Sequence, residues 1–193
     1  SYENPKETFD INVMGTINLL DVIREIESVK IIGVVTTDKV YKNIESGRRF
    51  IESDQLEGKD PYSASKVATE AVITAWNTLN SMKNSKKIVA LRAGNVIGGG
   101  DFAANRLLPD IVRGFQTNKK IEIRNAMSTR PWQHVIDPLL GYLAAMQYSV
   151  DNGDIKAFNF GPLEGSLSVG EVMKIASNVL KVEFQSKGQQ LSQ

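Results

Sequence analysis

Residues 30–38 read KIIGVVTTD, an apolar run that ends in a polar turn, and this stretch decides the fold. The run is short, β-branched and apolar at consecutive positions, which is typical of a parallel strand buried on both faces. Residues 87–93 (KIVALRA) repeat the pattern and open into residues 94–101, a predicted loop that is too rich in glycine for a regular element. Because ligands bind beyond the carboxyl ends of parallel strands, we expect functional residues directly after both runs.

Helical patterns alternate with these strands. Apolar residues at three- and four-residue intervals predict a helix over about residues 5–27, and Asp60-Pro61 predicts the start of a second helix that runs to about residue 82. The remaining elements are predicted as helices near 105–117, 136–149 and 168–180, strands at 120–124 and 157–160, and an extended segment at 130–135. The alternation favours an α/β fold with a doubly wound parallel sheet of the Rossmann-like type.

A doubly wound nucleotide-binding domain normally opens with a strand, a glycine-rich turn and a helix. The glycines at 98–100 lack the G-x-G-x-x-G spacing, so we expect the glycine-rich half to precede residue 1 and the chain to be an internal fragment. Residues 1–93 are then the C-terminal part of the dinucleotide-binding domain. We expect residues 94–193 to be a mixed region truncated at its C-terminus, with segments that return to the main sheet at about 131–160. Such a fragment would expose an unpaired apolar strand edge, so we expect it alone to be inactive and prone to associate.

Composition excludes several classes of function. Of 193 residues, 41% are hydrophobic and the net charge is +1, so no field over the whole protein gathers nucleic acid or anionic membrane. There is no cysteine and His134 is the single histidine, which excludes a thiolate or multi-histidine metal site. No apolar run reaches the roughly 18 residues of a membrane span. We expect a cytoplasmic protein with no bound metal.

Tyr62 and Lys66 lie at the start of the helix expected after Asp60. Residues four apart share one helical face, so the ammonium group can lie beside the phenol. A free phenol, with a pKa of about 10, is a poor base, but a neighbouring cation favours the phenolate and makes proton abstraction from an alcohol feasible. Taken alone, however, Tyr-x-x-x-Lys also fits an exposed helix face without a function.

The order of Thr37, Tyr62 and Lys66 resembles the catalytic triad of the short-chain dehydrogenases, with Thr37 at a strand end. In the hexose 4,6-dehydratases of that superfamily, an Asp-Glu pair directly after the Thr performs the elimination of water. Here the pair is Asp38-Lys39, and Thr-Asp-Lys is similar to the CDP-glucose branch of the extended short-chain dehydrogenase/reductase (NAD-dependent epimerase/dehydratase) family.

Four further blocks, at residues 8–16, 91–101, 105–109 and 129–138, extend the resemblance. It implies that Asn12 lies near the catalytic residues and the cofactor, which Tyr62 and Lys66 also contact. It further implies that residues 94–193 contain a nucleotide-sugar-binding lobe, with substrate contacts from Asn95, Arg106, Arg130 and His134. A helix amino terminus with an arginine is a sound diphosphate site, which supports the role of Arg106.

The resemblance implies NAD as cofactor and CDP-glucose as substrate. Tyr62, Lys66 and Thr37 would serve oxidation at C4, Asp38 and Lys39 would eliminate water across C5 and C6, and the hydride would return to C6 to give CDP-4-dehydro-6-deoxyglucose. It also implies a homo-oligomer, a dimer or tetramer. Two alternatives remain: another nucleotide-sugar epimerase, reductase or dTDP- or GDP-sugar dehydratase of this fold, and a non-catalytic binding domain.

Overall fold

The computed structural model describes residues 1–45, 47–83, 86–117, 125–152 and 155–180. Its helical elements are α1 (Pro5–Phe9), the π-helical segment η1 (Asp10–Met14), α2 (Gly15–Arg24), the 3-10 turn η2 (Asp38–Val40), α3 (Pro61–Lys83), α4 (Leu107–Thr117), α5 (Ile136–Asn152) and α6 (Val169–Leu180). Its strands are β1 (Ile31–Val35), β2 (Lys87–Ala93), β3 (Val96–Ile97), β4 (Thr129–Arg130), β5 (Gln133–His134), β6 (Ala157–Phe160) and β7 (Leu167–Ser168). These elements form two units, one of residues 1–94 and 136–161, the other of residues 95–135 and 162–193.

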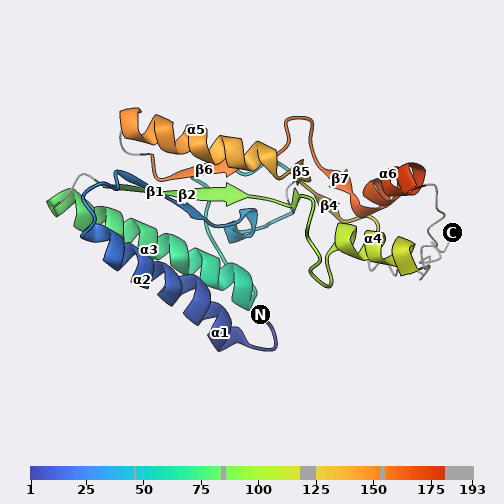
Figure 1. The fold of residues 1–193 in the computed structure, drawn as a ribbon, viewed down its shortest axis with the longest axis horizontal. Coiled ribbons are helices and arrows are strands. Elements are labelled where there is room, and N and C mark those ends of the chain that lie inside the picture. Colours follow the sequence, from blue (N-terminus) through green and yellow to red (C-terminus); the bar gives the residue numbers. More distant parts are fainter. Residues whose placement is uncertain (46, 84–85, 118–124, 153–154, 181–193) are drawn as a thin grey trace. The chain divides into compact units, whose positions relative to one another are not determined.

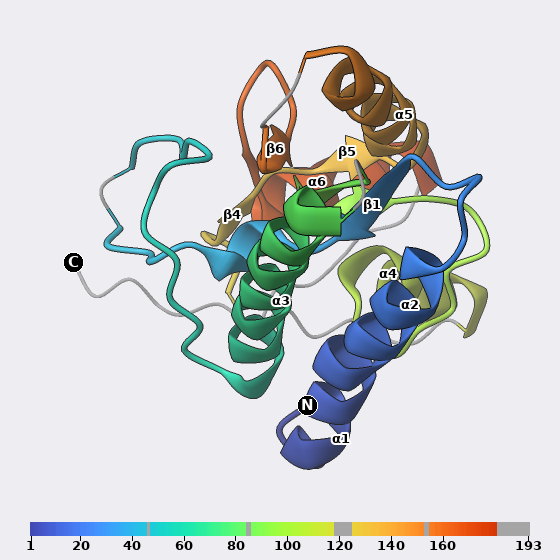
Figure 2. The ribbon, with the colours of Figure 1, turned by 90° about the vertical axis from the view of Figure 1, so that its left-hand side faces the viewer.

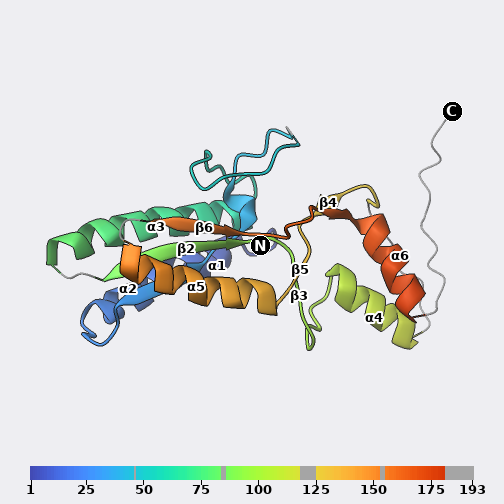
Figure 3. The same cartoon turned by 90° about the horizontal axis from the view of Figure 1, so that it is seen from above.

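The first unit is built on a parallel sheet with the strand order β1-β2-β6. In the register, Ile31 faces Lys87 and Ala90 faces Ala157. Helices α2 and α3 cover one face of this sheet and α5 covers the other (Figure 1). Figure 2 shows α2 beside α3, and Figure 3 shows α5 running along the strands. The doubly wound α/β class predicted from the sequence is therefore confirmed.

Alternate residues of β2 supply the two cores of the first unit. Ile88 and Ala90 pack with Leu20 of α2 and Ile73 of α3, whereas Val89 and Leu91 pack on the other face with α5. A strand places successive side chains on opposite faces, so a strand covered by helices on both sides must be apolar at consecutive positions. This requirement explains the run that the sequence shows at residues 87–91.

The second unit contains two short sheets and two helices. Strand β3 pairs with β5 in parallel, and β4 pairs with β7 in antiparallel fashion. The prediction that residues 94–101 are too rich in glycine for a regular element was wrong at β3, because the backbone of residues 96–97 pairs with residues 133–134. The strand predicted at 120–124 lies outside the described residues.

The long helix predicted over residues 5–27 is present but not uniform. It runs as α1, η1 and α2, with a π-helical stretch at Asp10–Met14. Within the described part of the chain, no helix has the length and apolar character needed to cross a membrane.

Asp60 caps the amino terminus of helix α3 with its side chain. Asp60 Oδ1 accepts hydrogen bonds from the backbone N–H groups of Tyr62 (2.9 Å) and Ser63 (3.1 Å), and the Ser63 hydroxyl donates to Asp60 Oδ2 at 2.8 Å. Gly58 lies against this turn, since a Cβ there would stand 2.3 Å from the backbone N of Ala64. Burial by itself raises the pKa of Asp60, but the hydrogen bonds from Ser63 and Tyr62 and the nearby Lys39 outweigh it, and the net shift is downward from 3.8.

We expect Asp60→Ala to lower the free energy of unfolding by about 1 kcal/mol at neutral pH, because two N–H groups of the first turn lose their acceptor. A carboxyl whose pKa is lowered in the folded state stabilises above its unfolded pKa and loses that contribution as the pH falls through the folded value. The difference between wild type and variant should therefore shrink below pH 3.8. Urea denaturation at several pH values measures it. Asp60→Asn, which keeps the acceptor oxygen, is the control, and an equal loss in both variants would contradict the cap.

Candidate active site

The carboxyl ends of β1, β2 and β6 lie at the same edge of the sheet, because the three strands are parallel. Thr37 follows β1 at this edge, is buried, and begins the turn η2. Its hydroxyl accepts from the backbone N–H of Lys39 at 3.3 Å and donates to Asp38 Oδ1 at 3.2 Å. Thr37 therefore fixes the backbone of the two residues that follow it.

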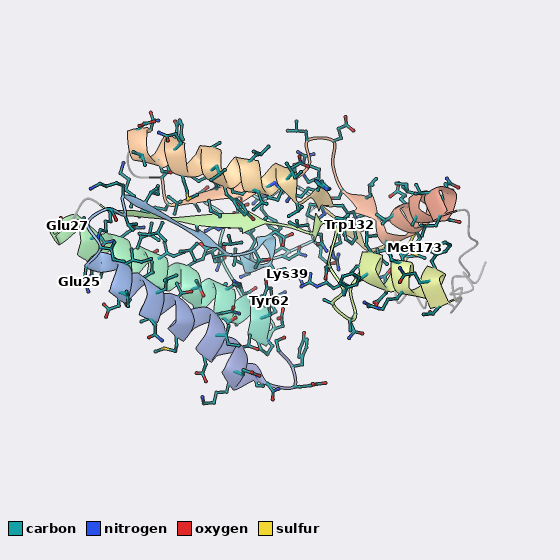
Figure 4. The ribbon with its side chains drawn as sticks, viewed as in Figure 1. Glu25, Glu27, Lys39, Tyr62, Trp132 and Met173 are labelled. Atoms are coloured by element: carbon teal, nitrogen blue, oxygen red, sulfur yellow. The ribbon has the colours of Figure 1, made fainter. Side chains whose placement is uncertain are left out.

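Tyr62 and Lys66 stand in the first two turns of α3. The Lys66 ammonium donates to the backbone carbonyl of Val35, at the end of β1, over 3.1 Å. The Lys39 Nζ lies 5.8 Å from the centroid of the Tyr62 ring, a distance at which the cation is attracted to the ring, and Figure 4 shows the two side chains close together. The structure thus brings the β1 end, η2 and the start of α3 to one place.

The five residues expected to be catalytic, Thr37, Asp38, Lys39, Tyr62 and Lys66, all lie in this group. The group contains two cations, one carboxyl, one phenol and one hydroxyl, which are the types needed for proton transfer at an alcohol carbon. Their roles in catalysis stay a prediction.

Asn12 lies on η1 and touches the same helix. Its side-chain amide donates to Ser65 Oγ at 2.9 Å, and Ser65 Oγ donates to the carbonyl of Tyr62 at 2.7 Å. The Asn12 carbonyl accepts from the hydroxyls of Thr16 (2.7 Å) and Thr69 (3.0 Å). π-Helical turns leave carbonyls without their regular helical partners, and here two threonine hydroxyls supply the bonds. Asn12 is thereby tied to the turn between Tyr62 and Lys66, while its predicted contact with a cofactor stays a prediction.

Burial lowers the pKa of the Lys66 ammonium from its ordinary value of 10.5, because a partly dry environment disfavours the charge. Among the described residues, the Lys66 ammonium donates to Val35, which uses one of the three donors that a lysine ammonium has. Lys66 is therefore a cation held in place with donors to spare.

We expect Lys66→Met to remove a pH dependence of stability. Between the lowered folded pKa and 10.5, the unfolded chain binds a proton that the folded chain does not, so the free energy of unfolding rises with pH across that window. The variant lacks this rise, so its stability relative to wild type should be highest at neutral pH and should decline as the pH approaches 10.5. Denaturant titrations from pH 7 upward measure the difference, and a difference independent of pH would contradict the burial of the charge.

The sequence patterns did not predict a buried polar cluster that links α3, β2 and the residue after η2. Glu70 of α3 and Arg92 of β2 form an ion pair with only 7% and 5% of their side chains exposed. Arg92 also donates to the Tyr41 hydroxyl at 2.7 Å, and Tyr41 donates to Asn159 Oδ1 at 2.6 Å. One signal was available: a charged residue, Arg92, interrupts a run that otherwise reads as a strand buried on both faces.

The four predicted substrate contacts all belong to the second unit. Asn95 is partly buried before β3, and its carbonyl accepts from the backbone N–H of Gln133 at 3.0 Å. His134 is exposed on β5, opposite Ile97 of β3. Arg106 is exposed immediately before α4. The predicted start of this helix near residue 105 was early, because Asn105 has a φ of 61°.

Arg130 is exposed on β4, and its guanidinium donates to the carbonyl of Thr129 at 2.6 Å. In the predicted loop, Gly100 has a φ of +80°, a conformation that favours glycine, and a Cβ at Gly98 would stand 2.9 Å from Val135 Cγ1. Gly100 thus allows a left-handed backbone conformation, and Gly98 allows the backbone to pack closely against Val135 in the second unit. The proposed contacts of the four side chains with a sugar nucleotide stay predictions.

The second unit also holds an apolar pocket of about 330 Å³ between α4 and α6. It is lined by aliphatic side chains and Trp132, whose indole N–H is used in a 3.1 Å bond to the carbonyl of Leu167. Such a lining offers nothing to a diphosphate or a sugar, so we assign no substrate to this pocket. Among the described residues, no group of three or more acidic, cysteine or histidine side chains could hold a metal ion.

Comparisons with known proteins agree with this architecture. The family model described as GDP-mannose 4,6 dehydratase matches residues 1–193. A CDP-glucose 4,6-dehydratase of Salmonella typhimurium is 43% identical over 169 residues, which are 84% of this chain and 47% of that protein. The chain thus spans about half the length of that relative.

Two solved structures show the same fold at 24% identity. A putative epimerase from Burkholderia cenocepacia superposes with a TM-score of 0.80 over 95% of this chain and 57% of its own. A dTDP-glucose 4,6-dehydratase from Bacillus anthracis, solved with NAD, gives 0.74 over 94% of this chain and 57% of its own.

The parallel sheet, with helices on both faces and functional groups at its carboxyl edge, defines a Rossmann-like α/β protein. Within that class, the chain belongs to the GDP-mannose 4,6 dehydratase family.

Proposed function

We propose that this chain carries the catalytic residues of an NAD-dependent nucleotide-sugar 4,6-dehydratase, a hydro-lyase, that acts on CDP-glucose. The observation that supports it best is the turn at Asp38 and Lys39, which is held by Thr37 and lies beside the Tyr62 ring. An acid and a base next to an oxidation triad are what dehydration requires beyond oxidation alone. The choice of CDP-glucose rests on the Thr-Asp-Lys form and on the 43% identical relative.

The residues at the sheet edge fit a nicotinamide cofactor. Lys66 lies at the carboxyl end of β1 with two donors beyond its bond to Val35, which suits ribose hydroxyls, and Tyr62 stands one turn before it. Asn12 supports the same turn through Ser65. NAD bound there would supply the hydride transfer, away from C4 of the sugar in the oxidation and back to C6 after the elimination.

The protein groups then move protons. Tyr62 takes the proton of the 4-hydroxyl, and the Lys66 cation favours the phenolate. The Thr37 hydroxyl, which donates to Asp38 Oδ1 without substrate, would rotate to donate to the same substrate oxygen. The C4 ketone makes the C5 proton acidic. Lys39, as the neutral amine, removes that proton while Asp38, as the carboxylic acid, protonates the departing 6-hydroxyl, so one water leaves for each sugar. Lys39 gives the proton back to C5 when the hydride returns to C6, and the proton released by the 4-hydroxyl restores the acid form of Asp38 through solvent. The product is CDP-4-dehydro-6-deoxyglucose.

The second unit would bind the nucleotide part of the substrate. Arg130 and Arg106 supply guanidinium groups for the diphosphate, and Arg106 stands before the amino terminus of α4, where backbone N–H groups favour an anion. Asn95 and His134 supply hydrogen bonds to the substrate.

The direct test uses a protein of the relatives' full length that contains this chain. With CDP-glucose and NAD it should release the 4-keto-6-deoxy sugar nucleotide without net consumption of NAD, as followed by mass spectrometry. Conversion of dTDP-glucose but not of CDP-glucose would contradict the assignment of Lys39 as the base. No conversion of either would overturn the proposed function.

Asp38→Asn should separate a dehydratase from an epimerase or reductase of the same fold. The amide keeps the shape and the oxygen that accepts from Thr37 but cannot donate the proton that the 6-hydroxyl needs to leave. We expect product formation to fall by about 10² to 10⁴-fold while the absorbance of enzyme-bound NADH accumulates after mixing with substrate. Unchanged formation of the dehydrated product would show that the elimination does not depend on Asp38, whereas release of an isomeric sugar nucleotide in its place would favour the epimerase.

Tyr62→Phe is the complementary variant, because it deletes only the hydroxyl that begins the reaction. We expect a fall of about 10² to 10⁴-fold in kcat with no accumulation of NADH, since the block precedes oxidation. The thermal unfolding midpoint should stay near that of wild type because the ring remains. A variant that forms NADH at the normal rate would exclude Tyr62 as the base.

A further inference from the structure

A continuous chain of buried hydrogen bonds connects α3, through the sheet edge, to the turn that carries Asp38 and Lys39. We infer that Glu70, Arg92 and Tyr41, which form this chain of bonds and are called the relay below, are positioning residues. They hold the turn in place relative to Tyr62 and Lys66. The inference rests on the proposed function for what the turn does, and on the contacts of the first unit alone for the positioning.

Glu70 fixes helix α3 to two strand ends. Its Oε1 accepts from the Thr36 hydroxyl and from Arg92 Nε, each at 2.8 Å, and its Oε2 pairs with Arg92 Nη2. Glu70 follows Lys66 by one helical turn on the same face of α3. A rotation or slide of α3 that displaced the catalytic phenol and amine would therefore break bonds to the ends of both β1 and β2.

Arg92 carries the connection from Glu70 to the far side of the turn. Its Nη1 donates to the Tyr41 hydroxyl at 2.7 Å and to the carbonyl of Glu52 at 3.0 Å. The guanidinium carbon lies 5.0 Å from the centroid of the Tyr41 ring. Tyr41 directly follows η2, so Arg92 fixes the turn from its C-terminal side while Thr37 fixes it from the N-terminal side.

Tyr41 locks the loop beyond the turn to the third strand. Its hydroxyl donates to Asn159 Oδ1 at 2.6 Å, and its ring stacks on Phe50 with centroids 4.8 Å apart. Asn159 of β6 in turn donates to the carbonyl of Phe50 at 3.2 Å. Backbone bonds from Lys42 N to Gln55 O and from Glu57 N to Val40 O, each 2.8 Å, close the loop.

The free-energy cost of burying two charges indicates that the ion pair of Glu70 and Arg92 serves to position other groups more than to stabilise the fold. Removing two charges from water is costly, and apolar side chains of similar volume in place of a buried pair are often equally stable or more so. Apolar side chains, however, cannot reproduce the directional bonds from Glu70 to Thr36 and from Arg92 to Tyr41. Since a misplacement of about 1 Å can cost a catalytic group about 10²-fold in rate, this directionality is what the relay supplies to the site.

The test replaces the pair by apolar side chains in the full-length protein. Glu70→Met combined with Arg92→Met leaves no charge unpaired, although the Thr36 hydroxyl loses its acceptor, so the thermal midpoint should fall far less than in Glu70→Met alone. We expect kcat for dehydration to fall by about 10 to 100-fold, with the dissociation constant for CDP-glucose within about twofold of wild type. Tyr41→Phe keeps the ring and loses only the hydroxyl. It should also lower kcat with little change in the dissociation constant for CDP-glucose, but by a smaller factor. A wild-type kcat in either variant would overturn the inference.

Lys86→Met is the matched control. Lys86 is also a buried cation of the first unit, 8% exposed, but it donates to the carbonyls of Ile23 (2.8 Å) and Arg24 (2.7 Å) at the end of α2. Its loss should lower the thermal midpoint and leave kcat at 25 °C unchanged, since the bonds at the catalytic turn remain. If the double variant lost activity only in proportion to its loss of folded protein, the inference would fail.

A second measurement is independent of the substrate and so separates this inference from the proposed function. Hydrogen exchange of the amides of Lys42 and Glu57 should accelerate by at least about tenfold in the double variant, while amides in the middle of α3 keep their rates. If wild type converts no CDP-glucose but the exchange rates change in this way, the positioning is supported and the proposed function fails. Unchanged exchange would overturn the positioning whatever the substrate.

Discussion

The parallel pairing of β1, β2 and β6 is the constraint on which the rest of this structure depends. Parallel strands end at a common edge, so Thr37, Arg92 and Asn159, which are far apart in the sequence, reach the same side of the sheet. Covering both faces with helices makes the strands apolar along their length and leaves polar groups to collect where the strands stop. The location of the site is thus a consequence of the sheet.

Polar groups gathered at a partly dry edge must find partners, because an unpaired buried charge or hydroxyl costs more than most single interactions contribute. The pair of Glu70 and Arg92, with Thr36 and Tyr41, satisfies this demand. The same bonds that satisfy the buried groups also bind α3 to the turn at Asp38–Val40. In this unit, the same set of hydrogen bonds therefore both satisfies the buried polar groups and arranges the functional groups.

Much of the arrangement could be predicted from local patterns. The strands of the first unit and helix α3 with its Asp60 cap follow from periodicity and capping residues, and the shared helical face of Tyr62 and Lys66 follows from their spacing. The grouping of Thr37 with them was implied by the resemblance to the short-chain dehydrogenases. The pair of Glu70 and Arg92 could not be derived in this way, because its members are brought together by the packing of a helix on a sheet. The π-helical stretch at Asp10–Met14 and the short strand at Val96–Ile97 were also missed, since each depends on a partner distant in sequence.

The sequence by itself determined the class of fold and the chemical types at the sheet edge, because hydrophobic periodicity and helix-start residues act locally and leave a direct record in residue order. Tertiary structure alone decided which side chains meet: Lys39 with the Tyr62 ring, Lys66 with Val35, and Arg92 with both Glu70 and Tyr41. The physical reason is that these contacts depend on the rotation of α3 and the path of the loop after η2. Close packing and the pairing of buried polar groups fix both only when the whole unit is assembled.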